Sequence, residues 1–269
     1  QAAMILIQND ELDIRKISES GQCFRLNKTG EGRYRLIAHD RELTLTQTGQ
    51  NIFLDCSQED FDALWKRYFD WDTDYPAIRI NVDPADAYLT RAAAFGSGVR
   101  ILRQDPWETL ITFILSQRKN IPAIKGCVEL LCSRFGEPIP GARAFAFPKP
   151  EALASAELEC LLGCSLGYRG KYVQAAARMA ASGELDFAAM ESLPDGALYE
   201  KLLTVPGVGK KVADCTMLFG FHRLGRFPVD VWIERVLTRE YPNGFPLERY
   251  ELFAGVLQQY IFYYERFRE

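Results

Sequence analysis

Between residues 23 and 55, apolar and polar side chains alternate along the chain. Tyr34, Leu36 and Ala38 fall at every second position, as do Leu43 and Leu45. Successive side chains of a strand point to opposite faces, so this period predicts half-buried antiparallel strands. The expected strands cover residues 23–27, 33–38, 42–46 and 51–55, with turns at Gly30 to Gly32 and at 48–50.

From residue 58 onward the apolar spacing is that of helices. Phe61, Leu64, Trp65 and Tyr68 are three or four positions apart, which places them on one helical face. Asp-Pro pairs at 83–84 and 105–106 indicate helix starts, because Asp caps the first amides and Pro fits the first turn. Further helices are expected at 121–135, about 150–161, 168–182, 195–203, 210–221, 231–240 and 246–267, with a loop-rich segment at 138–150.

This order of elements predicts an α+β fold. We expect an N-terminal antiparallel β-sheet domain with helices, followed by a mainly α-helical body. Gly96 and Gly98 interrupt the helical pattern near residues 93–99 and predict a domain boundary there. The expected domains are residues 1–98 and 99–269.

The composition of the 269 residues is that of a globular protein, with 48% hydrophobic and 25% charged residues. The apolar content excludes disorder of the whole chain. No apolar run approaches the roughly 20 residues that cross a bilayer, so no membrane partner is expected. Residues 1–11 lack the basic and apolar segments of a secretory signal.

Cysteine and histidine positions exclude several kinds of site. Seven cysteines, an odd number without a recognisable signal peptide, indicate reduced thiols and a cytosolic location. There is no CxxC pair, and neither His39 nor His222 is near a cysteine pair, so no metal site is expected. No cysteine follows Cys215, which excludes a C-terminal four-cysteine iron–sulfur loop. Two isolated histidines also give little support to Ser–His or Cys–His catalysis.

The most informative segment is 203–215, Leu-Thr-Val-Pro-Gly-Val-Gly-Lys-Lys-Val-Ala-Asp-Cys. One helix is expected to end before Thr204 and another to begin near Lys210, with a tight hairpin between them. Gly207 and Gly209 would let another backbone approach closely. The amides of such a hairpin and of the next helix N-terminus suit a phosphate group. An ordinary corner between two helices is the alternative.

Two lysines at the start of the second helix favour the functional interpretation, because the helix dipole disfavours cations there. Lys210 is explained as a phosphate contact. Lys211 would experience a second ammonium group and a positive helix end, which both favour its neutral amine. A neutral lysine is a nucleophile that can form a Schiff base. A solvated surface lysine is the alternative for Lys211.

Asp230 stands nineteen residues after Lys211, at the end of Phe-Pro-Val-Asp and just before a helical run. It can act as an ordinary helix N-cap. The loop at 222–229 can also return Asp230 to the Lys211 end of the preceding helix, which would create an acid/base pair.

These segments resemble the helix–hairpin–helix DNA glycosylases, and in particular the 8-oxoguanine DNA glycosylases with AP lyase activity. Residues 21–25 (Gly-Gln-Cys-Phe-Arg) are similar to the Gly-Gln-Ser-Phe-Arg of that family. Residues 99–106 (Val-Arg-Ile-Leu-Arg-Gln-Asp-Pro) and 166–169 (Leu-Gly-Tyr-Arg) match two further family segments. Ala254, Gly255, Gln258 and Phe262 resemble its base-pocket helix, so the resemblance runs from about residue 20 to the C-terminus.

The resemblance implies a catalytic pair and a base pocket. The target nucleotide would be flipped out of the duplex, because its C1′ is shielded in the stack. Lys211 would attack C1′, and Asp230 would help to activate the lysine and offset positive charge on the sugar. Gly21 would accept the N7–H that 8-oxoguanine has and guanine lacks. Cys215 and Phe262 would contact the two faces of the base and Gln258 its Watson–Crick edge, although both Cys215 and Phe262 also suit a core.

The resemblance also implies contacts with both DNA strands. Arg169 would read the base opposite the lesion, with a phosphate contact or a solvated arginine as the alternatives. The other implied DNA contacts are Arg118, Asn120, Tyr168, Gly207, Gly209 and Lys210. The expected partner is double-stranded DNA containing 8-oxoguanine, bound by a monomer without a cofactor. The expected location is the nucleoid in a bacterial cytoplasm or the nucleus of a eukaryote.

The net charge of −4 and pI near 5.5 are unusual for a DNA-binding protein. We expect clusters of cationic side chains to bind DNA despite the negative net charge. Residues 99–126 contain five cationic and two acidic side chains, and residues 168–178 contain three cationic side chains and no acid. One positive face would be enough to attract DNA in a salt-dependent way.

Two other functions are compatible with parts of this pattern. A monofunctional glycosylase for alkylated bases would use water as the nucleophile and would not need Lys211. A non-catalytic helix–hairpin–helix module would explain Lys210 and the hairpin but not Asp230 or residues 21–25.

The opposite-base segment departs from the family pattern, which leads to a prediction. The family's Asn-Asn-Asn is Arg118, Lys119 and Asn120 here, and its second cytosine-reading arginine falls on Ala123. Trp232 stands where histidine is common. We therefore predict relaxed discrimination of the base opposite the lesion. Excision rates measured opposite all four bases test this, and strong selectivity for cytosine would contradict it.

Overall fold

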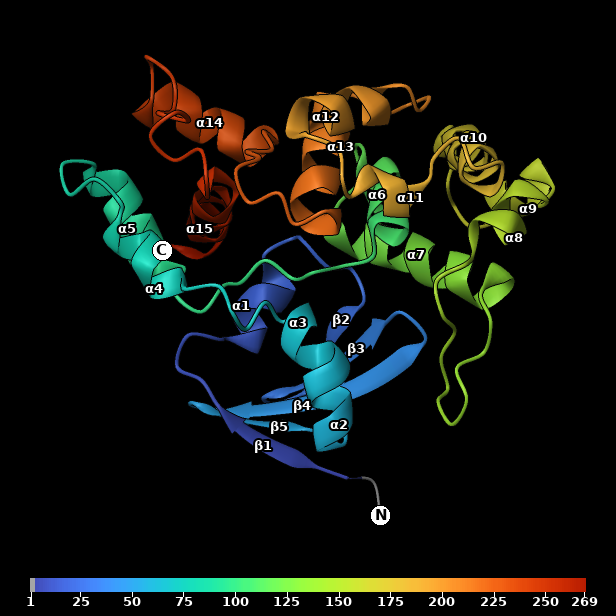
Figure 1. The fold of residues 1–269 in the computed structure, drawn as a ribbon, viewed down its shortest axis with the longest axis horizontal. Helices are drawn as coiled ribbons and strands as arrows, with labels where there is room; N and C mark the ends of the chain where they lie inside the picture. The colour runs from blue at the N-terminus through green and yellow to red at the C-terminus, as the bar shows by residue number, and fades with distance from the viewer. Residues whose placement is uncertain (1–2) are drawn as a thin grey trace. The chain divides into compact units, whose positions relative to one another are not determined.

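The computed structural model describes residues 3–269 and confirms the α+β fold (Figure 1). Within this range a five-stranded sheet has the order β1-β5-β4-β3-β2. β5 pairs antiparallel with both β1 and β4, and Leu45 lies opposite Leu54. Leu43, Leu45, Ile52 and Leu54 are buried at alternating positions, as the period of two predicts. The strands are β1 (Ile5–Gln8), β2 (Leu26–Gly30), β3 (Arg33–Ala38), β4 (Arg41–Thr48) and β5 (Asn51–Leu54).

The start of the sheet differs from the prediction. β1 and the short helix α1 (Ile14–Glu19) were not predicted, because four residues and six residues are too few to establish a period. The strand expected at 23–27 begins only at Leu26. Gln22 and the next four residues are all buried, so this segment runs through the core instead of lying half-exposed on a sheet face.

Helical segments follow the sheet. The segment predicted from residue 58 is confirmed, although it contains a π-helical turn. The helix start expected at Asp83 is wrong. Asp83 accepts a hydrogen bond from the Ala85 amide in a turn, and Asp86 caps the helix by accepting from the Leu89 amide. The segments are α2 (Gln58–Asp60) with η1 (Phe61–Trp65) and α3 (Lys66–Tyr68), then α4 (Tyr75–Ile80) and α5 (Ala87–Phe95).

Helices dominate the rest of the chain. Asp105 caps α6 with Pro106 in its first turn, as predicted, and α7 has the predicted bounds. The helix expected at 150–161 is two short helices. The elements are α6 (Pro106–Ser116), α7 (Ile121–Phe135), α8 (Pro150–Ala154), α9 (Leu158–Leu162), α10 (Arg169–Ala181), α11 (Phe187–Met190), α12 (Asp195–Leu203), α13 (Lys210–Cys215), η2 (Thr216–Gly220), α14 (Val231–Glu240) and α15 (Ala254–Phe267).

The last helix begins later than the predicted residue 246. Residues 246–253 form turns instead, and α15 starts at Ala254. The Gly255 amide donates to the Leu224 carbonyl at 2.7 Å. Gly225 packs so closely on the Glu251 carbonyl that a side chain there would collide with it. The chain before α15 is therefore shaped by its contact with the loop at 222–229.

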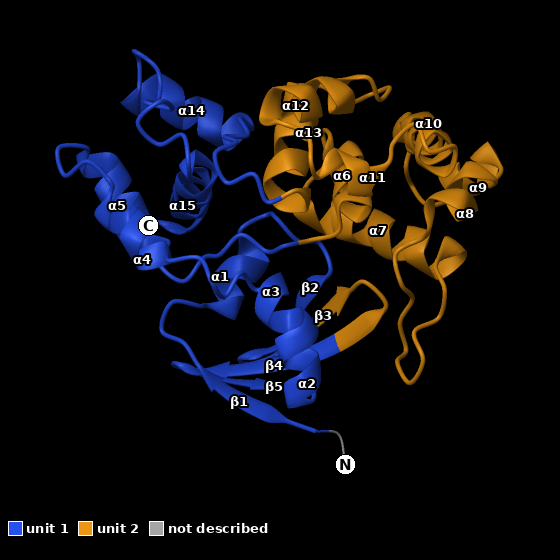
Figure 2. Ribbon diagram, viewed as in Figure 1, with its two compact units in different colours: residues 1–35, 43–103, 222–269 blue, residues 36–42, 104–221 orange. Residues whose placement is uncertain are grey.

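The chain forms two compact units that do not divide at one point in the sequence (Figure 2). Unit 1 comprises residues up to 35, 43–103 and 222–269, and unit 2 comprises 36–42 and 104–221. In unit 1, α5 packs beside α15 (Figure 1). In unit 2, the buried helix α6 contacts α7, α10, α13 and η2. The sequence division at residue 98 stays a prediction.

A buried carboxylate organises the polar interior of unit 1. Asp70 accepts hydrogen bonds from Tyr75 at 2.6 Å and Arg103 at 3.2 Å, and it lies 3.1 Å from His222 Nε2. Arg100 is buried and donates to the Asp70 carbonyl at 2.6 Å. Arg100 and Arg103 therefore bind Asp70 inside unit 1, although from the sequence they count among the cations available for DNA. Within residues 3–269, no helix is both long and apolar enough to cross a membrane.

The Asp70 network predicts a loss of stability in acid. Burial alone would raise the pKa of Asp70, but hydrogen bonds from His222 and Tyr75 outweigh it and lower the pKa to about 2. The stabilisation is therefore present above about pH 4 and is lost as the pH falls through about 2, and it amounts to about 2 kcal/mol. In urea unfolding, the free-energy difference between wild type and Asp70→Asn should shrink from pH 7 to pH 2.5. An equal difference at both pH values would contradict the assignment.

Candidate active site

A tight hairpin joins α12 to α13, as the sequence predicts. The Val208 amide donates to the Val205 carbonyl at 3.0 Å, which closes the turn. Gly207 has a φ of +81°, and a Cβ atom there would lie 2.4 Å from the Tyr172 ring. Gly209 has a φ of −98°, and nothing lies within 4 Å of the position of its Cβ. The hairpin therefore requires glycine at 207 for steric reasons but not at 209.

The first turn of α13 carries two lysines and no acidic residue. Lys210 is exposed and Lys211 half-buried. Cys215 is buried four residues after Lys211, on the same face of the helix. The first amides of a helix have no intrahelical partner, so this end attracts anions. Lys211 thus combines partial burial, a neighbouring cation and an anion-attracting backbone.

In unit 1, Gly21 and Phe262 lie against each other. Gly21 has a φ of +72°, and the Phe262 ring is 3.0 Å from where its Cβ would be. Any side chain at 21 would displace the ring, so this contact requires glycine. Arg266 lies 5.2 Å from the Phe262 ring centroid and donates to the Glu19 carbonyl at 2.9 Å. The ring is thereby held on two sides.

Gln258 links α15 to the segment that carries Asp230. Its Nε2 donates to the Pro228 carbonyl at 3.0 Å, and its Oε1 accepts from Gln259 at 3.1 Å. An amide group has two donor and two acceptor positions, so one of each remains for a ligand. Asp230 caps α14 by accepting from the Ile233 amide at 2.8 Å, which confirms its interpretation as an N-cap. Its catalytic role stays a prediction.

The Leu-Gly-Tyr-Arg segment lies beside the end of α6 in unit 2. Arg169 is only 7% exposed, and its Nε and Nη2 both donate to the Gln117 carbonyl. Tyr168 is 50% exposed, and its ring centroid is 4.4 Å from the Arg169 guanidinium carbon. Of these two predicted DNA contacts, Tyr168 presents the larger accessible surface.

The Arg-Lys-Asn segment has three different environments. Arg118 is exposed with a φ of +54°, a strained conformation for a side chain of this size. Lys119 donates to the Ser165 carbonyl at 3.0 Å. Asn120 caps α7 by accepting from the Ala123 amide at 2.9 Å. Arg118 is therefore the exposed cation of this segment, whereas hydrogen bonds within unit 2 hold Lys119 and Asn120.

The predicted residues form two groups, one in each unit. Unit 1 contains Gly21, Gln258, Phe262 and the segment ending at Asp230, whereas unit 2 contains Arg118, Asn120, Tyr168, Arg169, Gly207, Gly209, Lys210, Lys211 and Cys215. Two supporting glutamines were missed by the sequence reasoning. Gln117 donates to the Gly207 carbonyl, and Gln22 donates to the Arg100 carbonyl at 2.7 Å and accepts from the Leu102 amide at 2.9 Å. Their only sequence signal was their position beside predicted site residues.

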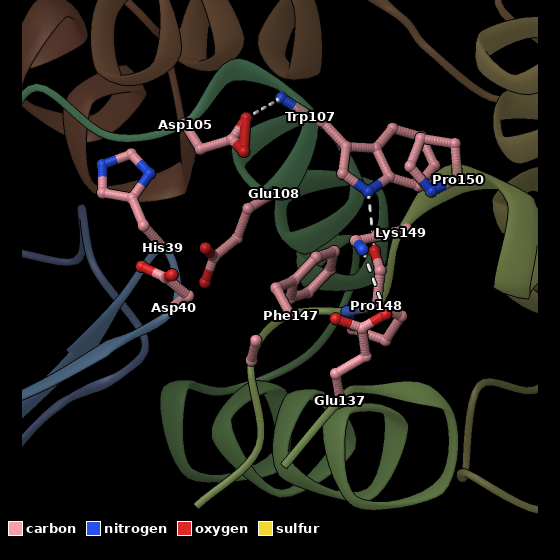
Figure 3. Close-up of a pocket in the computed structure, with 11 residues that line it drawn as sticks. His39, Asp40, Asp105, Trp107, Glu108, Glu137, Phe147, Pro148, Lys149 and Pro150 are labelled. Atoms are coloured by element: carbon pink, nitrogen blue, oxygen red, sulfur yellow. Dashed lines mark hydrogen bonds and ion pairs between the residues drawn. The ribbon is translucent and has the colours of Figure 1, made fainter. Parts of the chain in front are cut away.

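Unit 2 also contains a cavity of about 410 Å³ (Figure 3). Its polar lining is mainly acidic, from Asp40, Asp105, Glu108 and Glu137, and Lys149 pairs with Glu137 at 3.0 Å. Burial raises the pKa of Asp105, against hydrogen bonds from the Trp107 and Glu108 amides and the nearby His39. None of the predicted site residues lines this cavity. Its carboxylates would repel a phosphate backbone.

Residues 3–269 hold neither a candidate metal cluster nor a disulfide. No cluster of three or more His, Cys, Asp or Glu side chains in this part of the chain is arranged to hold a metal ion. None of the seven cysteines, all within residues 3–269, forms a disulfide.

Comparison with known proteins identifies the family. Residues 4–110 match the model of the 8-oxoguanine DNA glycosylase N-terminal domain, and residues 111–244 match that of the HhH-GPD superfamily base excision DNA repair proteins. The chain is 32% identical over 266 residues to the N-glycosylase/DNA lyase of Saccharomyces cerevisiae, covering 88% of this chain and 70% of that protein. The chain belongs to the 8-oxoguanine DNA glycosylase/lyases.

Solved structures of this glycosylase family agree with the fold throughout the chain. MBOgg1 in complex with a low-affinity DNA ligand has a TM-score of 0.92 at 36% identity, covering 99% of this chain and 96% of that one. The Clostridium acetobutylicum 8-oxoguanine glycosylase/lyase, solved with double-stranded DNA containing cytosine opposite 8-oxoguanine, gives the same score and coverage at 32% identity. The predicted family and fold are confirmed.

The two hairpin glycines of this glycosylase should respond differently to alanine. Gly207→Ala requires a left-handed backbone and displaces Tyr172, so we expect a loss of about 1–3 kcal/mol of unfolding free energy. Gly209→Ala enters open space at an ordinary φ and should change stability by less than about 0.5 kcal/mol. Urea unfolding of the two variants checks this. Equal losses of unfolding free energy would show that the Tyr172 contact does not require glycine at position 207.

Proposed function

We propose that this protein removes 8-oxoguanine from duplex DNA through Lys211 and then cleaves the strand by β-elimination. The observation that carries the proposal is the position of Lys211 in the first turn of α13, beside Lys210 and without any acidic residue. Folding alone favours an acid at this end of a helix. Membership of the glycosylase/lyase family supplies the reaction class.

Lys211 is the nucleophile in this proposal. Once the nucleotide is flipped out, the neutral amine attacks C1′, the glycosidic bond breaks and the base leaves with a proton. The sugar ring opens to an imine on the lysine. Loss of a C2′ proton then expels the 3′ phosphate, and water hydrolyses the imine to regenerate the amine.

Asp230 supports this step electrostatically. A carboxylate near the sugar offsets the positive charge that develops as the base departs. Asp230 also caps α14, and Gln258 holds the carbonyl of Pro228 two residues earlier. The Asp230 carboxylate is thus held by the Ile233 amide and the chain just before it by Gln258, which suits a group that must be positioned before the reaction.

The base is recognised by Gly21 and Phe262, which lie against each other. The Gly21 carbonyl accepts the N7–H of 8-oxoguanine, whereas guanine would place a lone pair against it. Phe262 stacks on the base and Cys215 contacts its other face. Gln258 uses its remaining donor and acceptor positions on the Watson–Crick edge.

The remaining predicted residues bind the DNA itself. Hairpin amides at Gly207 and Gly209, together with Lys210, hold a phosphate. Tyr168, Arg169, Arg118 and Asn120 contact the opposite strand. The protein acts as a monomer on double-stranded DNA containing the lesion, in the nucleoid of a bacterium or the nucleus of a eukaryote.

Borohydride trapping on a duplex with 8-oxoguanine opposite cytosine tests the proposal. The wild type should form a covalent adduct, and Lys211→Gln should form none because it has no amine to make the imine. Lys210→Gln is the matched control one residue away. It should retain the adduct while binding DNA more weakly and with a smaller salt dependence.

The other outcomes separate the alternatives. Base release without an adduct in the wild type would favour a monofunctional glycosylase. An adduct that survives in Lys211→Gln but not in Lys210→Gln would assign the nucleophile to the other lysine. Binding without either product would favour a non-catalytic module.

A further inference from the structure

We propose that Gln117 is a positioning residue that couples the opposite-strand segment to the hairpin that carries Lys211. The inference rests on the function proposed above and adds a residue to it. Gln117 follows α6 directly and lies between Arg169 and Gly207, which belong to segments far apart in the sequence. All three residues are in unit 2.

The side chain of Gln117 holds the hairpin. Its Nε2 donates to the Gly207 carbonyl at 3.1 Å and to the Ile114 carbonyl at 3.2 Å. The Ile114 contact fixes the amide to the last turn of α6, so the Gly207 carbonyl is tied to a buried helix. A hairpin carbonyl without such a donor would be free to rotate its peptide plane.

The main chain of Gln117 holds the opposite-strand segment. Its carbonyl accepts from Nε of Arg169 at 2.8 Å and also from Nη2. Charge-assisted hydrogen bonds from a planar guanidinium are among the stronger and more directional ones in proteins. Arg169 is at the start of α10, immediately after Tyr168.

A second contact joins the same two segments. Tyr172 lies one turn after Tyr168 on α10, and their ring centroids are 6.2 Å apart in an edge-to-face arrangement. The Tyr172 ring fills the space that a side chain at Gly207 would need. The α10 start and the hairpin are therefore linked twice, through Gln117 and through Tyr172.

Through this arrangement, a movement of the residues that contact the opposite DNA strand would also move the hairpin before Lys211. A shift of Tyr168 and Arg169 against the opposite strand would move the Gln117 carbonyl and, through its amide, the Gly207 carbonyl. Lys211 follows four residues later at the rigid start of α13. Because a displacement of about 1 Å can cost a reaction about a hundredfold in rate, loss of the Gln117 link should slow chemistry more than binding.

A purely structural role for Gln117 is the competing explanation, and the chain offers a matched control. Gln174 is a buried glutamine on α10 whose Nε2 donates to the Ala156 carbonyl at 2.8 Å. Like Gln117, it ties a loop carbonyl to a helix within unit 2. The acceptor of this hydrogen bond, Ala156, is not among the residues proposed to bind DNA or to react.

The experiment compares Gln117→Met with Gln174→Met, because methionine preserves the side-chain length and removes the donor. Both variants should lose comparable stability in urea. At a temperature where both are folded, Gln117→Met should excise 8-oxoguanine at least tenfold more slowly in single turnovers. Its affinity for an uncleavable duplex should stay within about twofold of wild type. Gln174→Met should excise at the wild-type rate.

Equal rate losses in the two variants, or a loss of affinity that accounts for the slower excision, would overturn the proposal. So would an unchanged rate in Gln117→Met while the wild type remains active. If the wild type itself neither excises nor traps, the proposed function fails instead, and the two failures are thus distinguishable.

Arg169→Lys completes the test of coupling. If Gln117 and Arg169 act through one link, the double variant should be slower by less than the product of the two single effects. Multiplicative effects would show that the two residues act independently and would refute the link.

Discussion

Loop carbonyls lack the regular partners that helices and strands provide, and a buried polar group without a partner is costly. In this protein, glutamine side chains supply the missing donors. Gln22 binds the backbone at Arg100 and Leu102, Gln117 binds Gly207, and Gln258 binds Pro228. Each glutamine precedes, follows or faces a residue proposed to act in recognition or catalysis. An amide suits this task because it donates without adding a charge that would compete with the substrate's phosphates.

Two features of the proposed site are unfavourable for folding. α13 begins with two cations where the dipole favours an acid, and Arg118 adopts a left-handed backbone without being glycine. Neither feature helps the fold. The interior around Asp70, where several side chains share one carboxylate, lies in the other unit.

The sequence was sufficient where a local rule applies. Caps at Asp105 and Asp230 mark two helix starts, and the two glycines with Lys210 locate the hairpin. It was insufficient where a distant partner decides. Contact with the loop at 222–229 delays the start of α15. Arg100 and Arg103 looked available for DNA because a composition count contains no information on burial. The supporting glutamines have no local pattern, since the backbone groups that they bind are 30 to 90 positions away in the sequence.

The discontinuous first unit has a consequence for how the chain is made. Residues 43–103 complete their unit only with residues 222–269, whereas most of the second unit is contiguous from 104 to 221. During synthesis the ribosome releases the N-terminal part first, yet its helical partners α14 and α15 emerge last. The second unit can therefore acquire its native contacts before the first does. Until α15 has been synthesised, the face of α5 that packs against it stays exposed to solvent.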